Sequence, residues 1–181
     1  KDVKVVQLKG GVSHAETNTY ASEILYLFGK AYNTTPLNLP LPAIVDHVVV
    51  KQAMEADRHI HKILDLGKRA NIAVFTIGSI KKDSLLFQMG YFTESDQKAL
   101  NEKAVGDICS RFFDKDGEVC NESLNERTLG VKLEDLRNKE YSILVAGGPN
   151  KIEGIYGALK GNYANVLITD QFSAKFLLDK K

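Results

Sequence analysis

Short apolar runs alternate along the chain with longer segments whose apolar residues recur at helical spacing. Apolar runs bounded by glycine, proline or polar turns are typical of buried strands, and a repeat of three to four residues is typical of amphipathic helices. Strands are predicted at residues 3–8, 71–77, 108–113, 140–146 and 166–169. Helices are predicted at residues 18–32, 46–70 (with a break near Asp57), 95–102, 149–159 and 171–178.

This alternation of strands and helices predicts the fold class. Strands that are apolar along most of their length are typical of parallel sheets, which helices cover on both faces. We therefore predict an α/β protein with a Rossmann-like, mostly parallel sheet and helices on both faces. Residues 36–42 are punctuated by prolines and are predicted to form a loop or a short edge segment.

Polar or glycine-rich junctions follow four of the predicted strands. They are Lys9-Gly10-Gly11, Gly78-Ser79, Gly147-Gly148 and Thr169-Asp170. In an open parallel sheet, ligands bind in the crevice outside the carboxyl ends of the strands, so we expect these junctions to meet at one rim. The alternative is that glycine, serine and aspartate serve only turn geometry and helix capping at these positions.

Lys9 is the first candidate for chemistry, because it ends an apolar run and two glycines follow it at once. Glycines let the backbone approach a ligand closely, and N–H groups at the start of the next helix suit an anion. An amine among apolar neighbours is also a better nucleophile towards a carbonyl. The alternative is that Lys9 only ends a strand at the surface.

Other strand ends carry candidate chemistry as well. The sequence from Gly147 to Lys151 places two glycines and an amine at a helix start, which suits a phosphate, although it matches neither the Walker A nor the GxGxxG motif. Asp170 either caps the last helix or accepts a hydroxyl of a ligand. Asp107 follows a glycine just before a strand, where a turn aspartate is the simpler interpretation.

Composition narrows the class of protein. The 181 residues suit one domain, and a net charge of +1 gives no electrostatic footprint for nucleic acid in this segment. No apolar stretch approaches the roughly 20 residues that cross a bilayer, so no membrane partner is expected. Cys109 and Cys120 lie outside any CxxC motif, which favours a reduced, cytoplasmic protein. His59 and His61 do not share a helix face, and neither a metal nor a cofactor is expected.

Residues 104–117, 143–159 and 166–178 resemble the effector-binding domain of SorC-family bacterial transcriptional regulators. Residues 5–23 resemble the deoxyribonucleoside-regulator branch of that family. The resemblance implies a Rossmann-like domain, related to phosphosugar isomerases, that senses a phosphorylated sugar without converting it. It also implies operator DNA binding through an N-terminal helix-turn-helix segment, assembly into dimers or tetramers, and deoxyribose 5-phosphate as the inducer.

The chain departs from the family pattern at its start. No helix-turn-helix segment precedes Lys1, and the glycine/serine/threonine loop that holds the phosphate in this family lies upstream of the segment that contains Lys9. We therefore expect residues 1–181 to be the C-terminal part of an effector domain. The DNA-binding domain and the start of the effector domain would lie outside this chain, and the phosphate site would be incomplete in it.

A 2-deoxypentose phosphate presents an aldehyde in its open-chain form, so our hypothesis is a reversible Schiff base on Lys9 without turnover. The alternatives are a phosphosugar isomerase or aldolase on the same fold, with Asp107 or Asp170 as the base, and a plain interaction domain. The expected effector-binding residues are Lys9, Gly10, Gly11, Asn18, Gly78, Ser79, Asp107, Gly147, Lys151 and Asp170.

Overall fold

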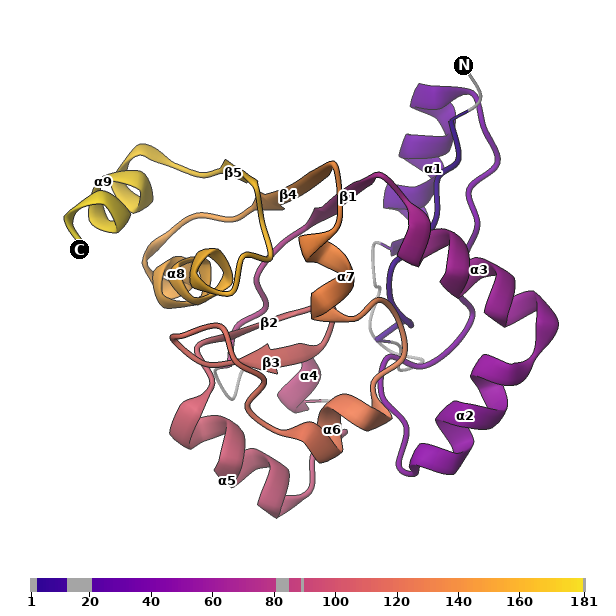
Figure 1. The fold of residues 1–181 in the computed structure, drawn as a ribbon, viewed down its shortest axis with the longest axis horizontal. Helices are drawn as coiled ribbons and strands as arrows, with labels where there is room; N and C mark the ends of the chain where they lie inside the picture. The colour runs from indigo at the N-terminus through magenta and orange to yellow at the C-terminus, as the bar shows by residue number, and fades with distance from the viewer. Residues whose placement is uncertain (1–2, 13–20, 81–84, 89, 181) are drawn as a thin grey trace.

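The computed structural model describes residues 3–12, 21–80, 85–88 and 90–180 (Figure 1). Its main sheet has three parallel strands in the order β1 (Ile72–Phe75), β4 (Tyr141–Val145) and β5 (Val166–Ile168). A separate antiparallel hairpin consists of β2 (Gly106–Ile108) and β3 (Arg111–Phe113). The predicted α/β class with a parallel sheet is confirmed.

Helices occur between these strands, as the sequence pattern predicted. In chain order they are α1 (Ala21–Tyr32), α2 (Val48–Ala56), α3 (Arg58–Arg69), α4 (Leu85–Gln88), α5 (Glu94–Lys103), α6 (Glu122–Arg127), α7 (Leu133–Arg137), the 3₁₀ turn η1 (Pro149–Lys151), α8 (Ile152–Lys160) and α9 (Gln171–Asp179). The predicted break in the segment 46–70 is confirmed at Asp57. Its side chain accepts hydrogen bonds from the backbone N–H groups of His59 and Ile60, and thereby caps α3.

The prediction of a strand at residues 3–8 is wrong. The backbone here forms isolated bridges to loops, including Val6 to Leu37 and Lys9 to Gly130, and it does not join the main sheet. An apolar run records burial, and loops can bury a segment as well as neighbouring strands can. Lys9 therefore follows an extended segment that is bound by loops.

The single strand predicted at residues 108–113 is also wrong. Ile108 pairs with Arg111, and the two residues between them have positive φ angles, 54° at Cys109 and 65° at Ser110. A two-residue hairpin turn of type I′ requires positive φ at both central residues, and Asn-Gly is its usual sequence. Cys-Ser is not a usual sequence for this turn, so the apolar pattern predicted one continuous strand across it.

One face of the main sheet packs against helices. Ala73, Phe75 and Leu144 form a hydrophobic core with Ile155 and Ala158 of α8. Leu133 and Leu136 of α7 belong to the same core, and Figure 1 shows α7 and α8 on one side of the sheet. Because the three strands of this sheet are parallel, the loops at their carboxyl ends lie at one edge of it.

The opposite face of the sheet is apolar and exposed. Five apolar side chains on this face are between 41% and 54% exposed: Ile72, Val74, Tyr141, Val145 and Ile168. Ile72 lies opposite Tyr141 in the parallel register, and Val145 lies opposite Ile168, so these residues form one surface. Within residues 3–12, 21–80, 85–88 and 90–180, helices cover one face of this sheet, whereas the sequence predicted helices on both faces.

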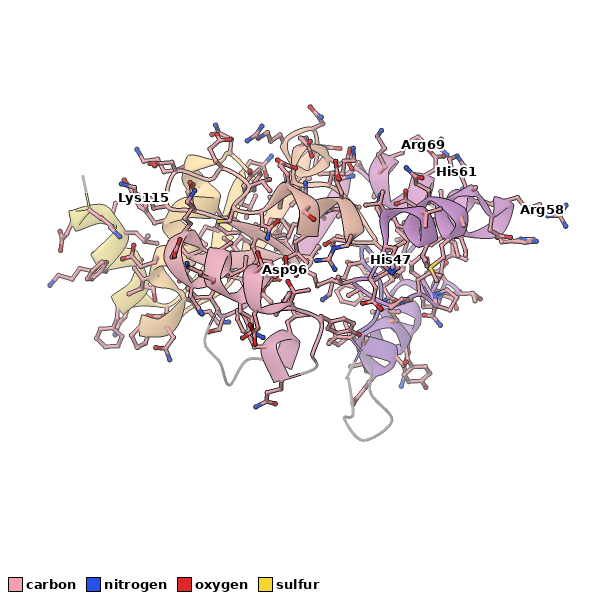
Figure 2. The ribbon with its side chains drawn as sticks, turned by 90° about the horizontal axis from the view of Figure 1, so that it is seen from below. His47, Arg58, His61, Arg69, Asp96 and Lys115 are labelled. Atoms are coloured by element: carbon pink, nitrogen blue, oxygen red, sulfur yellow. The ribbon has the colours of Figure 1, made fainter. Side chains whose placement is uncertain are left out.

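A buried ion pair links α5 to the end of α6. Arg127 donates to Asp96 Oδ2 at 2.8 Å, and the two side chains are 11% and 7% exposed. Asp96 also accepts hydrogen bonds from Thr93 and from Asn121 Nδ2, and Figure 2 labels it on α5. Burial alone raises the pKa of Asp96, but the hydrogen bonds from Thr93 and the charge of Arg127 outweigh burial and hold this pKa below its usual value.

This ion pair predicts acid sensitivity of the fold. Because the pKa of Asp96 is lower in the folded state, its contribution to stability is present above the unfolded value of about 3.9 and is lost as pH falls through the folded value. An Asp96→Asn variant is expected to lose about 3–5 kcal/mol of unfolding free energy at neutral pH, since it leaves the charge of Arg127 buried and unpaired. Urea unfolding between pH 7 and pH 3 measures both effects. A difference between the two proteins that does not shrink in acid would contradict this assignment.

Candidate functional site

The segments that follow the three strands of the main sheet meet at one rim. The Lys151 amine, after β4, donates to the carbonyl oxygen of Ile77, after β1, at 2.6 Å. The backbone N–H of Gly148 donates to Asp170 Oδ2, after β5, at 2.8 Å. Parallel strands present their carboxyl ends at the same edge, so their junctions lie close together, as the sequence predicted.

Lys9 reaches this rim through the β2–β3 hairpin. Its amine donates to Ser110 Oγ at 2.9 Å, and the backbone N–H of Ser110 donates to Asp107 Oδ2, also at 2.9 Å. The backbone N–H of Gly78 in turn donates to the carbonyl oxygen of Asp107 at 2.8 Å. A continuous set of contacts therefore joins Lys9 to the junction that follows β1.

Asp107 is the buried carboxyl group of this cluster, with 5% of the residue exposed. Burial raises its pKa, and the positive charges of Lys9 and Lys151 oppose that rise. A side chain at Gly78 would clash here, because a Cβ atom would lie 1.7 Å from Asp107 Oδ1. Glycine at this position therefore allows the close approach of the Asp107 carboxyl group.

Asp170 is a helix cap that also holds the loop after β4. Its Oδ1 accepts hydrogen bonds from the backbone N–H groups of Phe172 and Ser173, and its Oδ2 accepts from Gly148 N and Ser173 Oγ. The Ser173 hydroxyl and these backbone N–H groups lower the pKa of Asp170 to about 2. A carboxylate offers about four acceptor positions, so these bonds use its capacity. The capping alternative is confirmed, and Gly147 fits because a Cβ there would lie 2.4 Å from Asp170 Oδ2.

The backbone N–H groups of the two glycines after Lys9 are bonded to carbonyl oxygens of other segments. Gly10 donates to the carbonyl oxygen of Leu129 at 3.1 Å, and Gly11 donates to that of Leu41 at 2.7 Å. A Cβ atom at Gly10 would lie 2.2 Å from the carbonyl oxygen of Pro42, so this glycine permits close backbone packing. Asn18 lies outside the described residues.

Two residues that the sequence did not single out support Lys9. Ser110 is fully buried and accepts the hydrogen bond from the amine. Arg111 is 3% exposed, and its guanidinium donates to α6 and to the loop after it. The acceptors are both oxygens of Asn125 in α6 and the carbonyl oxygens of Thr128, Gly130 and Val131 in the loop. The same loop pairs with the backbone around Lys9, through the bridge between Lys9 and Gly130 and the hydrogen bond from Gly10 N–H to the carbonyl oxygen of Leu129. No local sequence signal marks these contacts, because the partners come together only in the fold.

The remaining candidates have surface or structural roles. Burial raises the pKa of the Cys109 thiol to about 11, as expected for an inert side chain. His61 lies with Arg58 and Arg69 on the exposed side of α3, as Figure 2 shows. Among the described residues, no set of three or more His, Cys, Asp or Glu side chains is placed to hold a metal ion. No helix in the described part of the chain is long and apolar enough to cross a membrane.

The rim therefore presents two lysine amines, Lys9 and Lys151, around one buried carboxyl group. A lysine amine can bind an anion through its charge, or it can condense with an aldehyde. An α/β domain with such a rim is suited to a small ligand that combines an anionic group with a carbonyl group.

Comparison with known proteins defines the family. A family model described as "Putative sugar-binding domain" matches residues 1–179. The deoxyribonucleoside regulator of Bacillus subtilis is 54% identical over 179 residues, covering 99% of this chain and 57% of that protein. The sorbitol operon regulator of Klebsiella pneumoniae is 33% identical over 138 residues, which is 76% of this chain and 44% of that regulator.

Solved structures agree with these relatives. A domain of a possible sugar-binding transcriptional regulator from Arthrobacter aurescens gives a TM-score of 0.83 at 38% identity, covering 97% of this chain and 69% of that chain. The full-length sorbitol operon regulator SorC from Klebsiella pneumoniae gives a TM-score of 0.86 at 28% identity, covering 97% of this chain and 57% of that one. The chain belongs to the family of sugar-binding domains of SorC-family transcriptional regulators.

Proposed function

We propose that this chain is the effector-sensing part of a repressor of deoxyribonucleoside catabolism, and that it binds deoxyribose 5-phosphate to release operator DNA. The similarity to the deoxyribonucleoside regulator supports the choice of sugar. The observation that carries the proposal is the Lys9 amine, held 2.9 Å from Ser110 Oγ at the rim where Lys151 supplies a second positive charge. Deoxyribose 5-phosphate matches this rim, because its open-chain form carries both an aldehyde and an anion.

The Lys9 amine would bind the sugar as a reversible Schiff base. The neutral amine attacks the aldehyde carbon, and a proton moves from nitrogen to oxygen to give a neutral carbinolamine. A further proton taken from solvent lets the hydroxyl group leave as water, which leaves an iminium ion with one N–H group. Water adds back to release the sugar unchanged. The carboxylate of Asp170 is engaged in capping α9, so Asp107 is the carboxyl group of the rim that remains for acid–base chemistry. A single carboxyl group supplies no acid–base pair, which supports binding without turnover.

The chain spans 57% of the length of the Bacillus subtilis regulator and 69% of the Arthrobacter aurescens domain. We propose that it is the C-terminal part of an effector domain, with operator DNA bound by a helix-turn-helix domain in the rest of the protein. The parent protein would form dimers or tetramers in the cytoplasm, where the operator lies. Other parts of the phosphate site would come from outside these residues.

A ligand screen by thermal shift tests the sugar. Deoxyribose 5-phosphate is expected to raise the unfolding temperature of the chain, and of the longer protein that contains it, more than ribose 5-phosphate or glucose 6-phosphate does. Ligand at a hundred times its dissociation constant stabilises the folded state by about 2.7 kcal/mol. No shift with any sugar phosphate would instead favour a plain interaction domain.

The isomerase or aldolase alternative rests on Asp107, the buried carboxyl group of the rim, whose pKa is raised by burial. Incubation with deoxyribose 5-phosphate separates the two functions. A sensor returns the sugar unchanged, whereas steady consumption of the sugar would establish an enzyme.

A further inference from the structure

The turn between β2 and β3 has an unfavourable backbone conformation for its residue types. Cys109 and Ser110 both have positive φ, at 54° and 65°, where glycine or asparagine is usual. Strain of this kind persists where the surrounding structure imposes it, and it is concentrated at functional sites. The serine side chain has a specific partner here, because its hydroxyl accepts the hydrogen bond from the Lys9 amine at 2.9 Å.

The surrounding contacts hold this hydroxyl rigidly. Ser110 is fully buried, and its backbone N–H donates to Asp107 Oδ2 at 2.9 Å. The next residue, Arg111, donates to carbonyl oxygens of the loop after α6. That loop also pairs with the backbone of Lys9, through the bridge to Gly130. One frame therefore holds both the amine and the oxygen that accepts its hydrogen bond.

We propose that Ser110 is the positioning residue for Lys9 in Schiff-base formation, an inference that rests on the proposed function. The hydroxyl oxygen accepts one N–H of the neutral amine and leaves the lone pair of the nitrogen free to attack the aldehyde carbon. After water leaves, the iminium nitrogen keeps one N–H, which donates to the same oxygen. A hydrogen bond from a charged donor is stronger than one from a neutral donor, so Ser110 favours the adduct over the free amine.

Two glycine substitutions in the same turn test this role. Ser110→Gly removes the hydroxyl and suits the positive φ, so the hairpin is expected to keep its fold. Cys109→Gly is the matched control, because it relieves the same backbone strain and leaves the hydroxyl in place. With deoxyribose 5-phosphate and cyanoborohydride, mass spectrometry is expected to show adduct formation about tenfold slower in Ser110→Gly and within twofold of the natural rate in Cys109→Gly.

A second measurement makes failure of this inference distinguishable from failure of the proposed function. Reductive methylation of Lys9 by formaldehyde, followed on the Lys9 peptide across pH 6–9, reports the reactivity of the amine without any sugar. A changed pH profile in Ser110→Gly supports the positioning role even where the natural chain forms no adduct with the sugar, a result that would overturn the proposed function alone. Equal profiles and equal adduct rates in Ser110→Gly and the natural chain would overturn the positioning role. Ser110→Ala repeats the measurement without the added flexibility of glycine.

Discussion

Replacing Lys9 with methionine is expected to abolish the covalent adduct with deoxyribose 5-phosphate. Methionine keeps an unbranched side chain of similar length but has no amine to attack the aldehyde. The apparent affinity for the sugar is expected to fall about hundredfold, which corresponds to about 2.8 kcal/mol. Mass spectrometry after borohydride reduction measures the adduct, and thermal shift measures the affinity.

Lys9→Arg is the control that separates charge from covalent chemistry. Arginine keeps a positive charge and can still donate to Ser110 Oγ, but its guanidinium does not form the imine. It is therefore expected to lose the adduct as completely as Lys9→Met does while binding the sugar more tightly than Lys9→Met. An adduct of undiminished yield in either variant would show that another amine reacts, and would exclude Lys9 as the site.

Replacing Arg111 with methionine is expected to destabilise the whole fold. The guanidinium satisfies carbonyl oxygens of Asn125, Thr128, Gly130 and Val131, and a thioether would leave these groups without a donor. A buried polar group that loses its partner costs about 1–3 kcal/mol, so we expect a loss of at least about 3 kcal/mol of unfolding free energy. Urea unfolding measures this loss.

Arg69→Met provides the comparison for Arg111→Met. Arg69 pairs with Asp65 on the exposed surface of α3, and such a pair contributes about 0.3–0.5 kcal/mol. If Arg111→Met were as mild as this exposed substitution, the loop after α6 would have to be held by other contacts. The support of Lys9 by that loop would then need a different explanation.

The sequence pattern predicted the parts of the fold that local periodicity determines. The strands at residues 72–75, 141–145 and 166–168 lie within the predicted apolar runs, because each packs apolar side chains against the hydrophobic core. The segment at residues 3–8 has the same apolar pattern, but it pairs with loops and not with a strand of the sheet. The pattern alone does not show with which segment the backbone pairs. The helices α4, α6 and α7 were not predicted, because four to six residues are too few to show a helical repeat.

The candidate site divides in the same way. The sequence predicted that Gly78, Gly147, Lys151 and Asp170 would meet, since parallel strands present their carboxyl ends together. The place of Ser110 beside Lys9 could not be predicted, because these two residues are 101 positions apart in the sequence. Ser110 also lies in a turn that lacks the usual turn residues. The sequence thus identified Lys9 as a candidate nucleophile, but it did not predict which side chain its amine contacts.

The exposed apolar face of the main sheet has a practical consequence for work with this chain. Aliphatic and aromatic side chains aligned across three strands form a surface on which a second sheet can stack, at the spacing of about 10 Å that is usual for packed sheets. The apparent molar mass from static light scattering is therefore expected to rise with concentration even when every molecule is folded. A charged residue in place of Val74 would reduce such self-association, since this side chain lies on the face opposite the core packed under α8. Such a substitution is therefore expected to lower self-association without changing the residues of the candidate site.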